Sequence, residues 1–170
     1  LYKDKKLKGV NTDGIGFFET LKENKVNKNF KNILLLGYGG VGKAVIVFLK
    51  KYFSKSTKIY CATRKNLSKQ IKKVGCNWIQ WNKKDNNLNK FNMIVNSTSL
   101  GFGKMRNKIP YNIEKKGEVN IVYDVIYNPK KTLLIKNSQK LGIKTINGLD
   151  MNLLQAHFAI KKVFKGKLIF

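Results

Sequence analysis

The sequence has little of what metal sites and disulfide frameworks require. Its 170 residues include two cysteines, Cys61 and Cys76, and one histidine, His157. These three residues do not fall at the spacing of zinc ligands, so we expect no metal site. Each cysteine lies in or beside an apolar run, which predicts two reduced thiols in a core and a cytoplasmic protein. We expect His157 at a surface or an interface.

Long apolar runs are also missing. No run approaches the roughly 20 residues that a membrane span needs, and no signal-peptide pattern opens the chain. We therefore expect no membrane partner. A chain of 170 residues fits one domain and can bury a proper core.

Acidic residues are few: nine, against 35 basic residues, which gives a formal net charge of +26. Such a charge ordinarily suggests nucleic acid as a partner. However, only Arg64 and Arg106 are arginines, and the lysines are spread along the whole chain. Lys, Asn, Ile, Phe and Tyr are residues that AT-rich codons specify, so genomic base bias explains the composition. We favour that explanation, and nucleic-acid binding stays as the alternative.

A glycine-rich turn is the most informative feature that is present. The apolar run Ile33–Leu36 breaks at Gly37, and a helical pattern follows from about Val41. In this strand–turn–helix context, Gly37 would make the turn, Gly39 would admit a pyrophosphate and Gly42 would allow close packing. The amino end of the helix would hold the phosphates. The alternative is a tight turn that binds nothing. The residues expected at a dinucleotide are Gly37, Tyr38, Gly39, Gly40, Val41 and Gly42.

Strand and helix patterns alternate along the chain. Helices are expected at Thr12–Asn24, Val41–Tyr52, Asn66–Val74, Thr132–Leu141 and Leu149–Phe164. Strands are expected at Ile33–Leu36, Lys58–Ala62, Asn77–Trp81, Met93–Asn96, Val119–Tyr123 and Lys144–Asn147. The Asn- and Lys-rich stretch Asn82–Lys90 is expected as a surface loop. This alternation predicts an α/β fold with a doubly wound, mostly parallel sheet and helices on both faces.

The end of the second strand predicts which dinucleotide binds. An NAD site places a carboxylate there, about 20 residues past the glycines, on the ribose 2′-hydroxyl. Here the strand runs into Thr63-Arg64-Lys65, which has no carboxylate and two cations. We therefore expect NADP(H). The alternative is that Arg64 and Lys65 are ordinary surface charges.

Four further motifs, together with the glycine turn, point to a family. They are Asn11-Thr12-Asp13-Gly14, Asn96-Ser97-Thr98-Ser99-Leu100-Gly101, Tyr123-Asp124-Val125-Ile126-Tyr127-Asn128-Pro129, and Asn147-Gly148-Leu149-Asp150-Met151 followed by Gln155. In this order they resemble shikimate dehydrogenase from about Val10 to Phe164, although quinate dehydrogenase shares most of the pattern. The resemblance implies a Rossmann-like fold and NADPH-dependent reduction of 3-dehydroshikimate to shikimate, a step of chorismate and aromatic amino-acid biosynthesis.

The resemblance also implies site residues. Asp13 would be catalytic, paired with a lysine, because a hydride added to a carbonyl leaves an alkoxide that must gain a proton. Substrate contacts would be Asn11, Tyr127 and Gln155. Cofactor contacts would be the glycine turn, Thr63, Arg64, Lys65, Thr98, Val125 and Gly148. Simpler roles stay open: Asp13 and Asn11 at a helix start, Tyr127 in packing, and Gln155 as a solvated side chain.

The family pattern also implies a domain that this chain lacks. In shikimate dehydrogenases the catalytic lysine and the shikimate-binding serines precede the Asn-Thr-Asp motif, and this chain starts ten residues before Asn11. We therefore expect residues 24–148 to form the NADP-binding domain. Residues 1–23 and 149–170 would be helical segments that bridge to the longer enzyme's own N-terminal substrate domain, and a homodimer is compatible with the pattern. The alternative is a non-catalytic remnant module.

Overall fold

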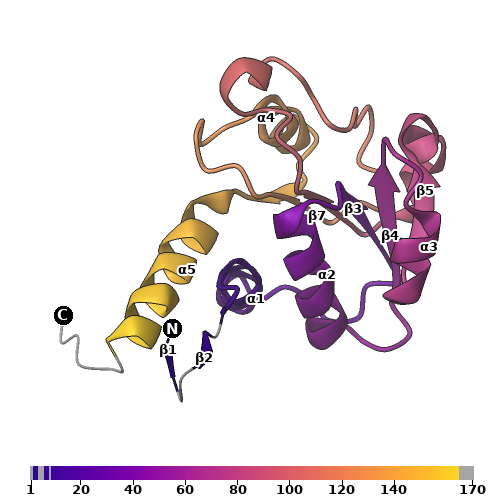
Figure 1. The fold of residues 1–170 in the computed structure, drawn as a ribbon. Helices are drawn as coiled ribbons and strands as arrows, with labels where there is room; N and C mark the ends of the chain where they lie inside the picture. The colour runs from indigo at the N-terminus through magenta and orange to yellow at the C-terminus, as the bar shows by residue number, and fades with distance from the viewer. Residues whose placement is uncertain (1, 4–5, 8, 165–170) are drawn as a thin grey trace.

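Six parallel strands form the centre of the molecule, in the order β5-β4-β3-β6-β7-β8 (Figure 1). The computed structural model describes residues 2–3, 6–7 and 9–164. The strands are β3 (Asn32–Leu36), β4 (Lys58–Thr63), β5 (Asn77–Gln80), β6 (Met93–Asn96), β7 (Ile121–Asp124) and β8 (Lys144–Ile146). The chain starts in the middle at β3, winds outward to β5, and then returns to build the other half from β6. This confirms the predicted doubly wound sheet.

Helices cover both faces of the sheet. They are α1 (Asp13–Glu23), α2 (Gly40–Tyr52), α3 (Ser68–Lys73), α4 (Leu133–Lys140) and α5 (Gly148–Val163). Ile33 and Leu35 of β3 face a core built with α1, α2 and α3, whereas Leu34 and Leu36 face a second core with α4. Because successive side chains of a strand point to opposite faces, a central strand must be apolar throughout. This is why β3 reads as one unbroken apolar run.

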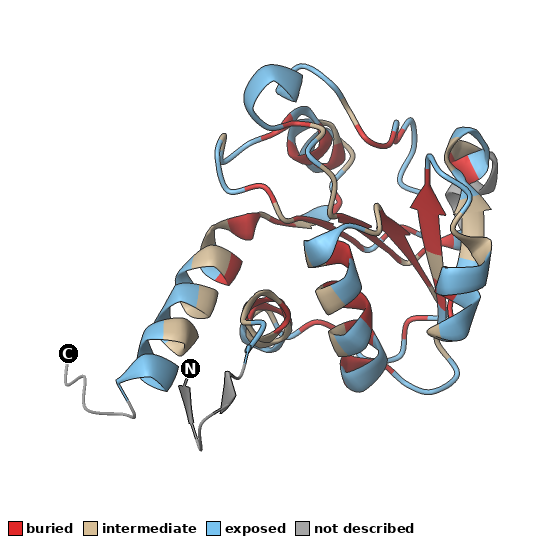
Figure 2. Ribbon diagram, in the orientation of Figure 1, coloured by how far each residue is buried: buried red, intermediate tan, exposed pale blue. Residues whose placement is uncertain are grey.

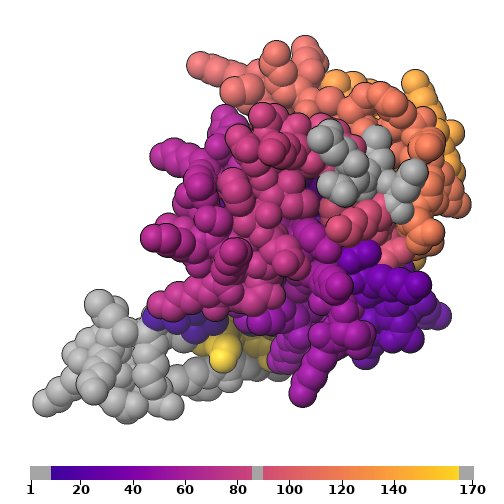
Figure 3. All heavy atoms as spheres, turned by 90° about the vertical axis from the view of Figure 1, so that its right-hand side faces the viewer, coloured from indigo at the N-terminus to yellow at the C-terminus, as the bar shows by residue number. Residues whose placement is uncertain are grey.

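The first helix lies between α2 and α5. The ring of Phe48 on α2 occupies the space that a Cβ would need at Gly14. The carbonyl of Met151 on α5 does the same at Gly16. Each glycine lets another element approach the α1 backbone closely. Buried residues therefore line the inner side of α1 and α2, while much of α5 is exposed or only half-buried (Figure 2). From the β5 edge, the magenta residues of the α3 and β5 region cover much of the visible face, and yellow residues of α5 show beneath them (Figure 3).

Three segments differ from the sequence prediction. The expected loop Asn82–Lys90 belongs to the 3-10 helix η1 (Trp81–Lys90), which also takes the last residue of the expected strand Asn77–Trp81, because a polar stretch can still form local turns. Strand β7 begins at Ile121 and ends at Asp124, later than expected, because its register with β6 pairs Asn96 with Asp124. Tyr2–Lys3 (β1) and Lys6–Leu7 (β2) pair as antiparallel strands, which the sequence did not predict. A second 3-10 turn, η2, covers Gly103–Met105.

Two kinds of feature are absent from the residues that the structure describes: membrane-spanning helices and clusters of metal ligands. None of the helices in the described part of the chain is long and apolar enough to span a membrane. Over the same residues, no three His, Cys, Asp or Glu side chains gather where they could hold a metal ion.

Candidate functional site

A pocket of about 630 Å³ opens at the carboxyl ends of β3, β4 and β6. The strand order reverses between β3 and β6, and ligands of open α/β sheets bind at such a switch point. Seven of the predicted cofactor residues line this one pocket, although they come from three separate segments. The lining residues are Gly37, Tyr38, Gly39, Thr63, Arg64, Lys65, Leu67, Trp81, Ser97, Thr98, Ser99, Leu100 and Met105.

The glycine turn has a distinct geometry at each of its three spaced glycines. Gly37 has a φ of +94°, which favours glycine, and its N–H donates to the carbonyl of Ala62 at 2.9 Å. A Cβ at Gly42 would lie 2.7 Å from the Gly37 carbonyl oxygen and 2.8 Å from Ser97 Oγ. A Cβ at Gly39 would have nothing within 4 Å. Gly42 thus packs the helix against the turn, while Gly39 leaves space beside the start of α2.

Gly40, Val41 and Gly42 of the glycine turn lie outside the pocket lining. Gly40 is the exposed first residue of α2, and Val41 is half-buried against the core. Tyr38 does line the pocket, and the ammonium group of Lys43 lies 5.7 Å from the centre of its ring. Burial raises the pKa of Tyr38 above its ordinary value, so the phenol stays protonated at neutral pH.

The turn after β4 brings positive charge to the pocket. Arg64 and Lys65 are exposed and line its edge, and Thr63 is buried beneath them. Among the lining residues that the structure describes, none carries a carboxylate. A pocket with two cations and no carboxylate at this position attracts a phosphate and lacks the usual partner of a free ribose 2′-hydroxyl.

A buried hydrogen-bond network supports the pocket from below, and the sequence alone did not reveal it. Asp124 accepts hydrogen bonds from Asn96 Nδ2 at 2.9 Å, from Thr132 Oγ1 at 2.7 Å and from the backbone N–H of Ile126 at 3.2 Å. Asn96 Oδ1 in turn accepts from Thr98 Oγ1 at 2.7 Å. Burial raises the pKa of Asp124, while these three donors act in the opposite direction. The available signal was a polar residue ending each of two central strands.

Val125 and Gly148 adjoin each other at the ends of β7 and β8. The carbonyl of Val125 occupies the space that a Cβ would need at Gly148. The N–H of Gly148 donates to the carbonyl of Ile126 at 3.1 Å. Neither residue is among the described residues that line the pocket at the glycine turn. A glycine is required at position 148 because any Cβ would meet this carbonyl.

The predicted catalytic and substrate residues lie away from that pocket. Asp13 is the half-buried first residue of α1, and Asn11 Oδ1 accepts from the N–H of Gly14 at 3.4 Å. Thr12 Oγ1 donates to Gln155 Oε1 at 2.9 Å, so Gln155 is held at the α1–α5 contact and is not a free solvated side chain. Tyr127 is 44% exposed, and its ring centre lies 6.5 Å from that of Phe102.

The strand order, the glycine turn at the switch point and the pocket beside it define an α/β protein of the Rossmann type. No family model matches the sequence. The chain is 38% identical over 163 residues to "Shikimate dehydrogenase (NADP(+))" of Pelagibacter ubique, a match covering 94% of this chain. Among solved structures, shikimate dehydrogenase from Aquifex aeolicus superposes with a TM-score of 0.80 at 30% identity over 99% of this chain. A shikimate dehydrogenase in complex with NADP+ gives 0.76 at 31% identity over 95%.

By sequence and by fold, the chain is similar to shikimate dehydrogenases over nearly its whole length. It spans only part of each relative: 59% of the Pelagibacter protein, 61% of the Aquifex structure and 58% of the structure with NADP+. This confirms the resemblance that the five sequence motifs indicated.

Proposed function

We propose that this chain is the cofactor-binding part of an NADP-dependent shikimate dehydrogenase. The observation that carries the proposal is the pocket that joins the glycine turn to the cationic turn at Thr63–Lys65. The relatives support it, because they are named shikimate dehydrogenase (NADP(+)) and one related structure contains NADP+. The reaction would be the reduction of 3-dehydroshikimate to shikimate.

The pocket suggests how the cofactor lies. The pyrophosphate would approach Gly39 and the amino end of α2, where free N–H groups and the helix dipole favour an anion. The 2′-phosphate would lie at Arg64 and Lys65. The nicotinamide would extend past Thr98 toward Val125 and Gly148, which continue the same edge of the sheet.

Asp13 would take part in proton transfer. NADPH supplies a hydride to the carbonyl carbon of the substrate, and the resulting alkoxide must gain a proton. Asp13 begins α1, where its carboxylate would orient and polarise the ammonium group of a lysine from the N-terminal domain. Gln155 is held beside Thr12 on the adjoining α5, and it would offer an amide to the substrate hydroxyls, with Asn11 and Tyr127 as further contacts.

Residues 24–148 would form the cofactor domain, and the flanking segments would bridge to the substrate domain. Exposed apolar side chains on α5 support this: Leu153 is 60% exposed and Val163 is 59% exposed. A protein partner that covered them would add apolar burial at about 25 cal/mol per Å². The isolated chain is therefore expected to bind NADPH without oxidising shikimate, because the family's lysine lies in the other domain.

Calorimetric titration with NADPH and NADH at physiological salt tests this proposal. We expect NADPH to bind at least about tenfold more tightly, a difference of about 1.4 kcal/mol. Arg64→Gln should remove most of this preference, whereas Lys58→Gln at the opposite end of β4 should leave it unchanged. Equal affinities would contradict the assignment to NADP. No binding of either nucleotide would support the remnant-module alternative, and shikimate-dependent NADP+ reduction by the isolated chain would contradict the need for a second domain.

A further inference from the structure

The hydroxyl of Thr63 is engaged entirely within the protein. Its Oγ1 donates to the carbonyl of Lys65 at 2.7 Å and accepts from Trp78 Nε1 at 2.8 Å. The side chain is 5% exposed. Because a hydroxyl has a single hydrogen to donate, Thr63 spends it on the turn and has none left for a ligand. The sequence predicts that Thr63 contacts the cofactor, but its hydroxyl cannot donate a hydrogen bond to the cofactor. The exposed side chains of Arg64 and Lys65 can.

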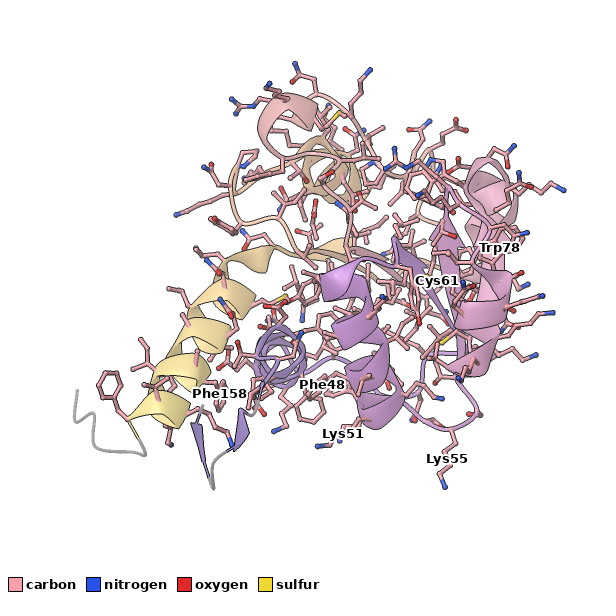
Figure 4. The ribbon with its side chains drawn as sticks, in the orientation of Figure 1. Phe48, Lys51, Lys55, Cys61, Trp78 and Phe158 are labelled. Carbon is pink, nitrogen blue, oxygen red and sulfur yellow. The ribbon has the colours of Figure 1, made fainter. Side chains whose placement is uncertain are left out.

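Trp78 is itself fixed by packing on β5. It pairs with Cys61 in the β4–β5 register, and it packs against the core cluster that includes Cys61 and Cys76. Thr63 lies two residues beyond Cys61, so both side chains point to the same face of the sheet. Figure 4 shows Trp78 and Cys61 together on the neighbouring strands. The indole N–H can only donate, and on this face of the sheet its acceptor is the hydroxyl of Thr63.

We propose that the Thr63–Trp78 hydrogen bond is a positioning element for cofactor specificity. It fixes the Thr63 hydroxyl, which in turn holds the carbonyl of Lys65 and so shapes the backbone of the turn. Arg64 and Lys65 are exposed, so packing does not fix their side chains. The conformation of the turn backbone therefore sets the position of their charged groups at the pocket edge. The inference rests on the proposed NADP site, because the held turn is the one that would receive the 2′-phosphate.

The energetic reason is preorganisation. A turn that is already held in its binding conformation loses less conformational freedom when the phosphate arrives. Without the bond, Arg64 and Lys65 would still be present, but they would have to be ordered during binding. NADH has no 2′-phosphate, so its affinity should depend much less on this bond.

Two substitutions test the inference. Trp78→Phe keeps an aromatic ring in the core and removes the N–H, and Thr63→Val removes the hydroxyl at nearly constant volume. Each should weaken NADPH binding about fivefold, as expected for one hydrogen bond of about 1 kcal/mol. NADH binding should change less than twofold. Thr63→Ser keeps the hydroxyl and should retain the preference, and the double variant should lose no more than either single one.

Calorimetry is the suitable readout, since one variant removes a tryptophan and would change protein fluorescence. Thr57→Val is the matched control, because Thr57 Oγ1 donates to the carbonyl of Phe30 at 2.7 Å near the opposite end of β4. An unchanged NADPH-to-NADH ratio in folded Trp78→Phe and Thr63→Val would overturn this inference alone. Equal binding of the two nucleotides by the unsubstituted chain would overturn the proposed cofactor and this inference with it.

Discussion

Asn96 and Asp124 are joined by a hydrogen bond of 2.9 Å at the buried ends of two neighbouring strands, β6 and β7. Both side chains are fully buried. The pair connects Thr98, which lines the pocket, to Ile126 in the loop that leads to the predicted substrate residue Tyr127. It therefore aligns the two loops between which a nicotinamide and its substrate would meet.

Removing the Asp124 carboxylate should destabilise the chain strongly. Asp124→Ala leaves the Asn96 amide and the Thr132 hydroxyl without their buried acceptor, at an expected cost of about 2–4 kcal/mol. Asp124→Asn keeps one acceptor oxygen and should cost far less. Urea unfolding followed by circular dichroism measures both. Equal losses in the two variants would show that the charge of the carboxylate, and not the acceptor oxygen that Asn retains, matters at this position.

The stability of Asp124→Asn relative to the parent chain should depend on pH. Burial raises the pKa of Asp124 in the folded protein, so the folded state binds the proton more tightly than the unfolded state. This contribution is fully present below the ordinary aspartate pKa and is lost as pH rises through the folded-state value. The unfolding free energy of the parent should therefore fall relative to Asp124→Asn between acid and neutral pH. A gap that moves the other way would contradict the direction of the pKa shift.

Two glycines of the same turn should respond differently to alanine. Gly39→Ala meets open space, so folding should change little, but the added methyl would stand where a pyrophosphate approaches and should weaken NADPH binding at least about tenfold. Gly42→Ala would push on the Gly37 carbonyl and Ser97 Oγ, with an expected loss of about 1–3 kcal/mol of stability. Thermal unfolding and titration of the two variants separate these effects. Unchanged NADPH affinity in Gly39→Ala would place the phosphates elsewhere.

Both cysteines should be unreactive in the folded protein. Burial raises the pKa of the Cys61 thiol to about 12 and also raises that of Cys76. Since the thiolate is the nucleophile, neither thiol should react with a disulfide reagent at pH 8 until the chain unfolds. Thiol titration across a urea series should release both groups together with the unfolding transition. Rapid reaction of one thiol in the absence of urea would show local opening near β4 or β5.

Local patterns predicted much of this fold and only part of its site. The run Ile33–Leu36 and the turn at Gly37 are local signals, because a central strand must be apolar and a tight turn needs glycine. The Asn96–Asp124 pair depends on the register of two strands that are distant in sequence, which no local pattern determines. The same holds for Trp78, whose contact with Thr63 exists only because β5 pairs with β4.

The prediction that Asp13 is catalytic depends on the family motif. In the structure, Asp13 is the first residue of α1. Composition and spacing offered only a helix-start residue at that position. The same motif brought in Gln155, whose contact with Thr12 depends on two helices at opposite ends of the chain. Such long-range contacts are set by the packing of whole elements, so a single sequence could suggest these residues only through the resemblance.

The winding of the sheet leaves one end of the molecule free for engineering. The turn between α2 and β4 lies at the amino end of the strand, opposite the pocket, and its exposed Lys55 projects away from the body (Figure 4). Because Cys61 and Cys76 are both buried, Lys55→Cys would give the described part of the chain a readily labelled thiol at this turn. A dye or a surface tether attached there would report on the protein without obstructing the entrance for ligands.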